Sequence, residues 1–195
     1  MELVLIRHAR PERIEDAGRP ADPDLTDLGH RQADLMAEWM APEIFDAVYT
    51  SPMARARQTS APLEARLGLT AGVVDGVMEF DADADHYIPM EDLKADKERW
   101  RRYLAGELSE DRSAFASTVV DSLEALIAEH RGHRIAVVCH GGVINMWACK
   151  VLGIGAQMFF EPHYTSIHRF MAASSGERSV VSLNEVAHLR AIDGS

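Results

Sequence analysis

The sequence predicts an α/β fold in which helices cover both faces of a mostly parallel central sheet, a three-layer α/β/α sandwich. Short apolar runs alternate with longer runs of helical periodicity along most of the chain, which is typical of this architecture. The hydrophobic fraction of 47% is sufficient to fill a core between three layers. A length of 195 residues favours one domain over residues 1–195.

The first half of the chain opens with a strand and then a long loop. Residues 2–6 form an apolar run that stops at Arg7 and His8, and residues 9–25 contain several prolines and glycines. Thr26 is placed to cap a helix that Pro42 follows. We expect strands at residues 2–6, 45–50 and 72–75, helices at 26–40 and 54–67, and an inner stripe on the first helix formed by Leu28, Ala33, Leu35, Met36 and Trp39.

Residues 76–110 are the least regular part of the chain. They open with an acidic stretch, residues 79–85, and continue into a charged segment at 91–104 that predicts a helix. We interpret residues 76–110 as an insertion over the functional site.

The second half returns to alternating helix and strand. A strongly periodic run is followed by Gly132, a typical helix end. We expect helices at residues 113–130 and 143–152 and strands at 134–139, 166–172 and 178–183.

Composition excludes several classes of protein. With 31 acidic and 20 basic residues, the formal net charge is -11, which argues against broad binding to nucleic acid or to an anionic membrane. We expect no signal peptide, because the sequence does not open with a basic and then an apolar run, and no membrane span, because no apolar stretch approaches about 20 residues. Two cysteines are too few for a disulfide framework, so a cytoplasmic location is expected.

Histidines follow two of the predicted strands directly. Arg7 and His8 end the first strand, and His140, Gly141 and Gly142 follow the strand at residues 134–139. Because ligands of open α/β sheets bind beyond the carboxyl ends of the strands, both histidines are predicted at one rim. The two glycines leave room for a ligand ahead of a helix N-terminus, which favours anions.

A third segment, residues 51–59, also follows a strand and opens a helix. Arg55 lies near the helix start and is expected to point to the same rim, whereas Arg57 would face elsewhere. Arginine binds phosphate oxygens in pairs and stays charged at working pH. Neutral histidine can attack phosphorus, and a second histidine can donate to the phosphoryl oxygens. Arg7, Arg55, His8 and His140 are therefore predicted to form a phosphate cage.

An acid is still needed to protonate the leaving oxygen. Glu79 is the first candidate, with Asp81 and Asp83 as reserves. Arg10 is a further cation near His8 that can select an anionic substrate, and Gly141 is expected to contact substrate. We expect no metal and no cofactor, because the aspartates at 81, 83 and 85 lack the glycine and glutamate of a calcium loop and the histidines lack zinc-like spacings.

These segments together resemble the histidine phosphatase superfamily, also called the phosphoglycerate mutase-like family. They occur in order as Leu5-Ile6-Arg7-His8-Ala9, residues 25–33, Ser51-Pro52 with Arg55 and Thr59, Glu79, and Val138-Cys139-His140-Gly141-Gly142. The resemblance implies a phosphoglycerate mutase-like fold, a phosphohistidine at His8, phosphoryl binding by Arg7, Arg55 and His140, and proton donation by Glu79.

The departures from the family favour its phosphatase branch. Ala9-Arg10-Pro11-Glu12 stands where the mutases usually have Gly-Glu-Ser after the histidine, and the long mutase insertion is absent. We therefore expect a metal-independent phosphomonoesterase acting on a small phosphorylated substrate. The alternatives are a phosphoglycerate mutase, a phosphohistidine protein phosphatase and a non-catalytic module that binds a phospholigand.

Overall fold

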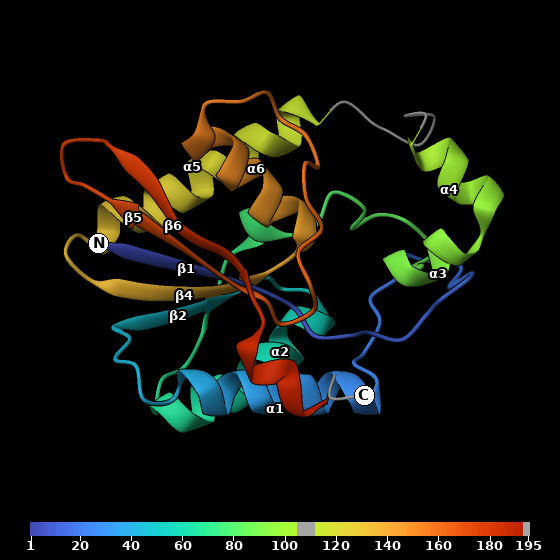
Figure 1. The fold of residues 1–195 in the computed structure, drawn as a ribbon, viewed down its shortest axis with the longest axis horizontal. Helices are drawn as coiled ribbons and strands as arrows, with labels where there is room; N and C mark the ends of the chain where they lie inside the picture. Colours follow the sequence, from blue (N-terminus) through green and yellow to red (C-terminus); the bar gives the residue numbers. More distant parts are fainter. Residues whose placement is uncertain (105–111, 193–195) are drawn as a thin grey trace.

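The computed structural model describes residues 1–104 and 112–192. Six strands form one sheet in the order β3-β2-β4-β1-β5-β6 (Figure 1). The first four strands in this order are parallel, and β5 runs antiparallel to both of its neighbours. The mostly parallel sheet expected from the sequence is confirmed, with strands at Glu2–Arg7 (β1), Ala47–Thr50 (β2), Gly72–Val73 (β3), Arg134–Cys139 (β4), Ile167–Ala172 (β5) and Arg178–Glu185 (β6).

Helices cover both faces of the sheet, as predicted. Helices α1 (Asp27–Met40) and α2 (Ala54–Leu67) lie on one face, and α5 (Ser113–Glu129) and α6 (Gly141–Leu152) lie on the other (Figure 1). The apolar run of β1 follows from this arrangement, because successive side chains of a strand point to opposite faces. Leu3 and Leu5 join the core under α5 and α6, while Val4 and Ile6 join the core over α1 and α2.

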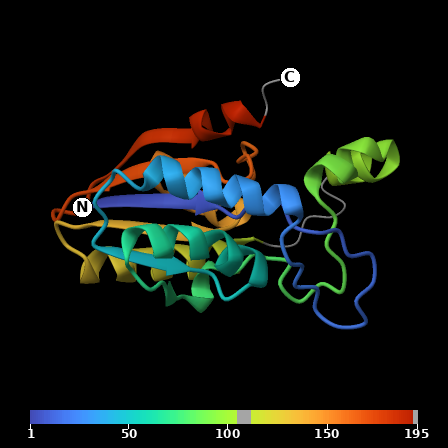
Figure 2. The ribbon, with the colours of Figure 1, turned by 90° about the horizontal axis from the view of Figure 1, so that it is seen from below.

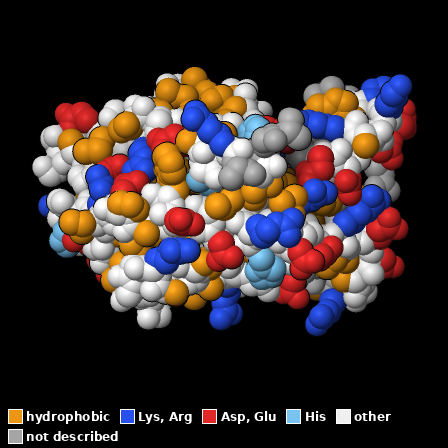
Figure 3. Space-filling view, turned by 60° about the horizontal axis from the view of Figure 1, so that its bottom comes forward, with side chains coloured by type: hydrophobic (Ala, Val, Ile, Leu, Met, Phe, Trp, Pro, Cys, Tyr) orange, Lys and Arg blue, Asp and Glu red, His pale blue; other side chains and the backbone are white. Residues whose placement is uncertain are grey.

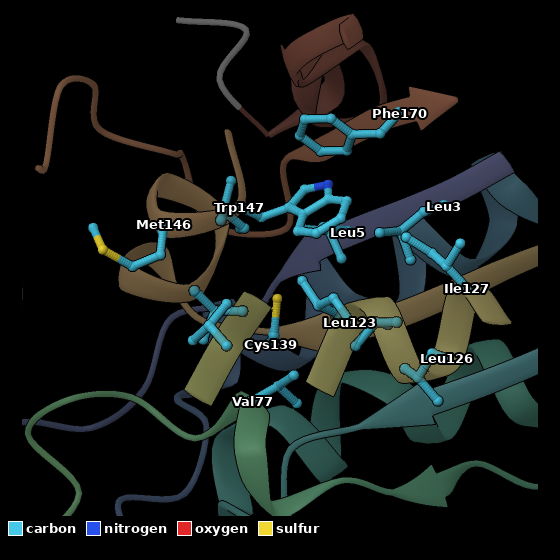
Figure 4. Close-up of a cluster of buried hydrophobic side chains, with 14 of the residues drawn as sticks. Leu3, Leu5, Val77, Leu123, Leu126, Ile127, Cys139, Met146, Trp147 and Phe170 are labelled. Carbon is cyan, nitrogen blue, oxygen red and sulfur yellow. The ribbon is translucent and has the colours of Figure 1, made fainter. Parts of the chain in front are cut away.

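Trp147 fills the centre of the core under α5 and α6. Its ring packs edge-on against Phe170 of β5 at 6.3 Å between centroids, with Leu5 and Leu123 close by (Figure 4). This packing fixes α6 against the sheet, and α6 is the helix that begins directly after His140.

Helix α1 begins as predicted but buries a different stripe. The Thr26 hydroxyl accepts the Gly29 N–H at 2.9 Å, which is a standard N-cap. The predicted inward position of Trp39 is wrong, because its side chain is 50% exposed. Small and flexible side chains instead let α1 approach the sheet closely, and the buried residues are Gly29, Gln32, Ala33, Met36, Ala37 and Met40.

The segment interpreted as an insertion contains two short helices rather than one. Helices α3 (Met90–Ala95) and α4 (Lys97–Leu104) meet at Asp96, which has an extended backbone. The Asp96 carboxylate accepts the Glu98 N–H at 3.1 Å and so caps α4, which explains the break. The end of the predicted insertion, residues 105–110, lies outside the described residues.

Two single-turn 3-10 helices, η1 (Asp75–Val77) and η2 (Ala187–Ala191), complete the elements. Viewed along the sheet, the carboxyl end of β1 points toward the loops that bear α3 and α4 (Figure 2). Within residues 1–104 and 112–192, none of the helices has the length and apolar character needed to cross a membrane.

Candidate active site

The sheet register brings the two strand-end histidines together. Arg7 of β1 pairs with Cys139 of β4, so the next residue of each strand leaves the sheet at the same level. The rings of His8 and His140 lie 5.1 Å apart between centroids, and both side chains are buried. Residues separated by most of the chain thus share one rim.

His8 is held as a neutral imidazole with a defined tautomer. Its Nδ1 lies 2.8 Å from the Ala9 carbonyl oxygen, which can only accept, so Nδ1 bears the proton and Nε2 keeps its lone pair. Burial lowers the pKa of His8 well below its ordinary value, and the charges of Arg55 and Arg7 lower it further. An unprotonated ring nitrogen is the form that a nucleophile requires.

A hydroxyl ties the end of β1 to α2. The Thr59 Oγ1 accepts the Ala9 N–H at 2.9 Å and donates to the Arg55 carbonyl at 2.7 Å. The backbone beside His8 and the backbone of Arg55 are therefore fixed to each other.

His140 presents one unpartnered ring nitrogen. Its Nε2 lies 2.8 Å from the Ser51 Oγ, while Nδ1 is buried with no hydrogen-bond partner among the described residues. Burial lowers the pKa of His140 well below its ordinary value, and the neighbouring side chains of Arg55, His8 and Arg7 lower it further. The ring is therefore neutral.

Arg55 is a buried cation without a hydrogen-bond partner in the described part of the chain. Its side chain is 1% exposed, and all three guanidinium nitrogens are unsatisfied. The nearest carboxylates, Asp22 and Asp81, lie 3.9 and 3.8 Å away. Burying a guanidinium whose donors have no hydrogen-bond acceptor is costly, and the oxygens of an anion between the histidines and Arg55 would remove that cost.

Arg7 supplies the second guanidinium. Its Nη1 donates to the Pro162 carbonyl at 2.5 Å, whereas its buried Nε has no hydrogen-bond partner among the described residues. The ring of Tyr164 lies 4.2 Å from the Arg7 Cζ, and the ring of Tyr87 lies 4.8 Å from the Arg55 Cζ. Each guanidinium is thus covered by a tyrosine ring, a cation–π arrangement that fixes its plane.

Glu79 lies at the N-terminus of α6. Its Oε2 accepts the Gly142 N–H at 2.9 Å. A Cβ at residue 142 would come within 2.0 Å of the Glu79 Oε1, so only glycine leaves room for the carboxyl group. Burial first, and then the nearby Asp81, raise the pKa of Glu79 to about 7, against the lowering effect of its backbone hydrogen bonds.

The structure separates the two reserve acids. Asp81 lies beside Arg55, and burial raises its pKa despite that positive charge. Asp83 is exposed and lies outside the cavity lining. Asp81 can therefore influence the site electrostatically, which Asp83 cannot do from its position.

The remaining predicted residues divide between cavity and surface. Gly141 lines the cavity, and Arg57 is exposed on α2, as its spacing from Arg55 predicts. Arg10 is directed to Glu91 of α3, with its Nε 3.3 Å from the carboxylate, and lies outside the cavity lining. The sequence analysis missed Tyr87 and Tyr164, since no periodicity or motif marks them.

The site opens into a cavity of about 320 Å³. Where the structure describes the chain, no three His, Cys, Asp or Glu side chains gather as a metal-binding group. The cavity is lined by Arg7, His8, Arg55, Glu79, Phe80, Asp81, Tyr87, Ile88, Trp100, Gly141, Met158, Phe159, Phe160, Glu161 and Pro162.

Comparison with known proteins gives matches over nearly the whole chain. Putative phosphoserine phosphatase 2 of Hydrogenobacter thermophilus is 29% identical over 96% of this chain and 97% of its own. A phosphoserine phosphatase of Entamoeba histolytica, solved with 3-phosphoglyceric acid, superposes with a TM-score of 0.77 at 24% identity, covering 96% and 98% of the two chains. A mycobacterial glucosyl-3-phosphoglycerate phosphatase gives 0.76 at 19% identity, covering 95% and 99%.

The structural matches confirm the predicted phosphoglycerate mutase-like fold. The family model described as histidine phosphatase superfamily (branch 1) matches residues 3–186. The chain therefore belongs to the histidine phosphatase superfamily, which confirms the family predicted from the sequence and the classification as a metal-independent phosphatase.

Proposed function

We propose that this protein hydrolyses small phosphomonoesters in two steps through a phosphohistidine on His8. The observation that supports this most strongly is the Arg55 guanidinium, buried beside two neutral histidines without a hydrogen-bond partner in the described chain. A phosphoryl group provides the oxygens that Arg55, Arg7 Nε and His140 Nδ1 would satisfy.

In the first step, the His8 Nε2 attacks phosphorus in line with the bond to the organic oxygen. The N–P bond forms as the P–O bond breaks, and Glu79 gives its proton to the departing oxygen. A pKa of about 7 keeps much of Glu79 protonated at neutral pH, so the acid is available. Arg7, Arg55 and His140 stabilise the charge on the phosphoryl oxygens.

In the second step, water attacks the phosphohistidine and Glu79, now ionised, accepts the water proton. The N–P bond breaks, orthophosphate leaves, and His8 and Glu79 return to their starting protonation states. Arginine and histidine side chains supply the electrostatic stabilisation that magnesium provides in many phosphoryl-transfer enzymes.

A small substrate fits the dimensions and charge of the site. A cavity of about 320 Å³ suits a small phosphorylated molecule, and the net charge of -11 disfavours nucleic acid and anionic membranes as partners. The printed names of the relatives, phosphoserine phosphatase and glucosyl-3-phosphoglycerate phosphatase, support the same class. We assign the reaction to the cytoplasm, since Cys139 and Cys149 are both free.

If all substrates form the same phosphohistidine intermediate, a kinetic experiment can test this proposal. With several phosphomonoesters and a fixed concentration of glycerol, the ratio of orthophosphate to glycerol phosphate should be the same for every substrate. The reason is that water and glycerol then compete for one intermediate, whatever the leaving group. A ratio that changes from substrate to substrate would contradict the two-step route.

A further inference from the structure

The cavity has two chemically different halves. The inner half holds the charged groups of the proposed phosphoryl site. The outer half is walled by apolar side chains from three separate segments, namely Phe80, Ile88, Trp100, Met158, Phe159 and Phe160. Any organic group attached to a phosphate in the inner half must lie against these walls.

The wall formed by residues 158–160 is held in place by one buried amide. Asn145 of α6 is fully buried, and its Oδ1 accepts the Phe159 N–H at 3.0 Å. Its Nδ2 donates to the carbonyls of Phe160 at 3.0 Å and Gly141 at 2.9 Å. The aromatic wall is therefore anchored to the same helix N-terminus as the phosphoryl site, and its distance from His8 is fixed.

The facing wall is also supported from behind. Phe80 follows Glu79 directly, and its ring packs edge-on against Phe115 of α5 at 5.9 Å between centroids. Phe80 and Phe159 are each 38% exposed. Exposed aromatic surface on a rigid support gains free energy when an apolar ligand covers it.

Two cations near the outer half pair with carboxylates. Lys94 pairs with Glu161, the one acidic residue lining the outer half, and lies 5.6 Å from the Trp100 ring centroid. Arg10 pairs with Glu91, and the Arg112 guanidinium lies over the Phe80 ring at 5.3 Å. A substrate carboxylate in the outer half would lie against apolar walls, where burying its charge is costly.

From these features we infer that the preferred substrates are phosphomonoesters whose organic group is a planar, apolar ring system without a carboxylate. This inference rests on the proposed phosphatase function and adds the class of the organic group. It separates this chain from the relatives whose printed names specify phosphoserine or a phosphoglycerate.

Three esters with primary-alcohol leaving groups test the inference at nearly constant chemical reactivity. They are propyl phosphate, 3-phenylpropyl phosphate and the phosphate ester of 3-hydroxypropionate. We expect kcat/KM for the phenyl compound to exceed that of propyl phosphate by about 10- to 100-fold, the effect of burying one ring. The carboxylate ester should be the poorest of the three.

Variants show whether the outer walls cause the preference. Phe159→Ala and Trp100→Ala should each reduce the phenyl-over-propyl ratio by about 3- to 30-fold, mainly through the KM of the phenyl ester. Trp39→Ala, at an exposed tryptophan of α1, should leave the ratio unchanged. An unchanged ratio in both wall variants would overturn the inference.

Two outcomes of this experiment distinguish the inference about the organic group from the proposed phosphatase function on which it rests. Hydrolysis of all three esters with the carboxylate compound preferred would overturn the inference and leave the phosphatase assignment standing. Failure to hydrolyse any of them would overturn the proposed function, and this inference with it.

Discussion

The proposed phosphoryl site and helix α3 are held by different kinds of interaction. The site is built from residues at the ends of β1 and β4 and the start of α2, all packed against a buried sheet. Helix α3 is joined to the rest by half-exposed ion pairs, including Arg10 with Glu91 and Arg13 with Asp92, each at 3.3 Å. Charged side chains of both signs are numerous on the surface at the end of the molecule that bears α3 (Figure 3).

This difference indicates that the two regions have different roles in the protein. Exposed ion pairs are worth about 0–1 kcal/mol each and weaken with salt, so helix α3 can change its contacts at little cost. The proposed phosphoryl site has buried, mutually fixed groups, which is what stabilisation of a charged transition state requires. Substitutions in the site should therefore lower kcat, whereas substitutions in helix α3 should alter KM.

The largest effect is expected for His8→Ala, which removes the proposed nucleophile. We predict a loss of kcat of about 10⁴-fold or more, because the other groups cannot replace a covalent route. Thermal unfolding followed by circular dichroism should show a folded protein, since His8 lies at a strand end. His30→Ala, at an exposed histidine of α1, is the matched control. Normal turnover in His8→Ala would disprove the mechanism.

Arg55→Ala should lower kcat/KM by about 10²- to 10³-fold, the effect of removing one donor to a developing negative charge. Steady-state kinetics with one phosphomonoester measure it. Arg57→Ala, two residues along the same helix but exposed, should change kcat/KM by less than about threefold. Equal losses in the two variants would mean that Arg55 acts through general electrostatics rather than by contact.

Glu79→Gln should slow esters of poor leaving groups by about 10²-fold and activated aryl esters much less, since only poor leaving groups need the proton. In the native protein, kcat/KM for poor leaving groups should fall as pH rises through about 7, because the acid form of Glu79 is lost. The lowered pKa of His8 keeps the nucleophile unprotonated to well below pH 6.5.

The variant should lose the alkaline limb of that pH profile. Asp83→Asn, at an exposed acid of the same loop, should keep it. An alkaline limb that persists in Glu79→Gln would assign the acid role to another group, with Asp81 the next to test.

The smallest effect is expected for Lys94→Ala, which breaks the contact between α3 and Glu161. KM should change by at most about fivefold and kcat should stay constant, as for an exposed ion pair. Raising the ionic strength should change KM more in the native protein than in the variant, because the variant has one exposed ion pair fewer to screen. A fall in kcat would show that helix α3 affects the chemical step.

The sequence predicted the parts of the molecule that depend on local pattern. Apolar runs of five or six residues mark strands buried on both faces, and their ends converge because parallel strands share one rim. That reasoning is sufficient to predict that His8, His140 and Arg55 lie close together. The fold and the family follow from the same patterns.

The sequence could not predict the contacts made by isolated loop residues. Tyr87 and Tyr164 cover the two arginines from segments without periodicity, and Asn145 orients the aromatic wall from the interior of an apolar helix. Trp39 was misplaced because the burial of α1 depends on close approach to the sheet, which helical spacing alone does not define.

The most direct test of the account is rapid quenching after brief exposure to a ³²P-labelled phosphomonoester. We predict acid-labile, alkali-stable label on His8, formed at least as fast as steady-state turnover, present in His30→Ala and absent from His8→Ala. Steady hydrolysis by the native protein with no label on His8 at any quench time, or with label on another residue, would contradict the central claim.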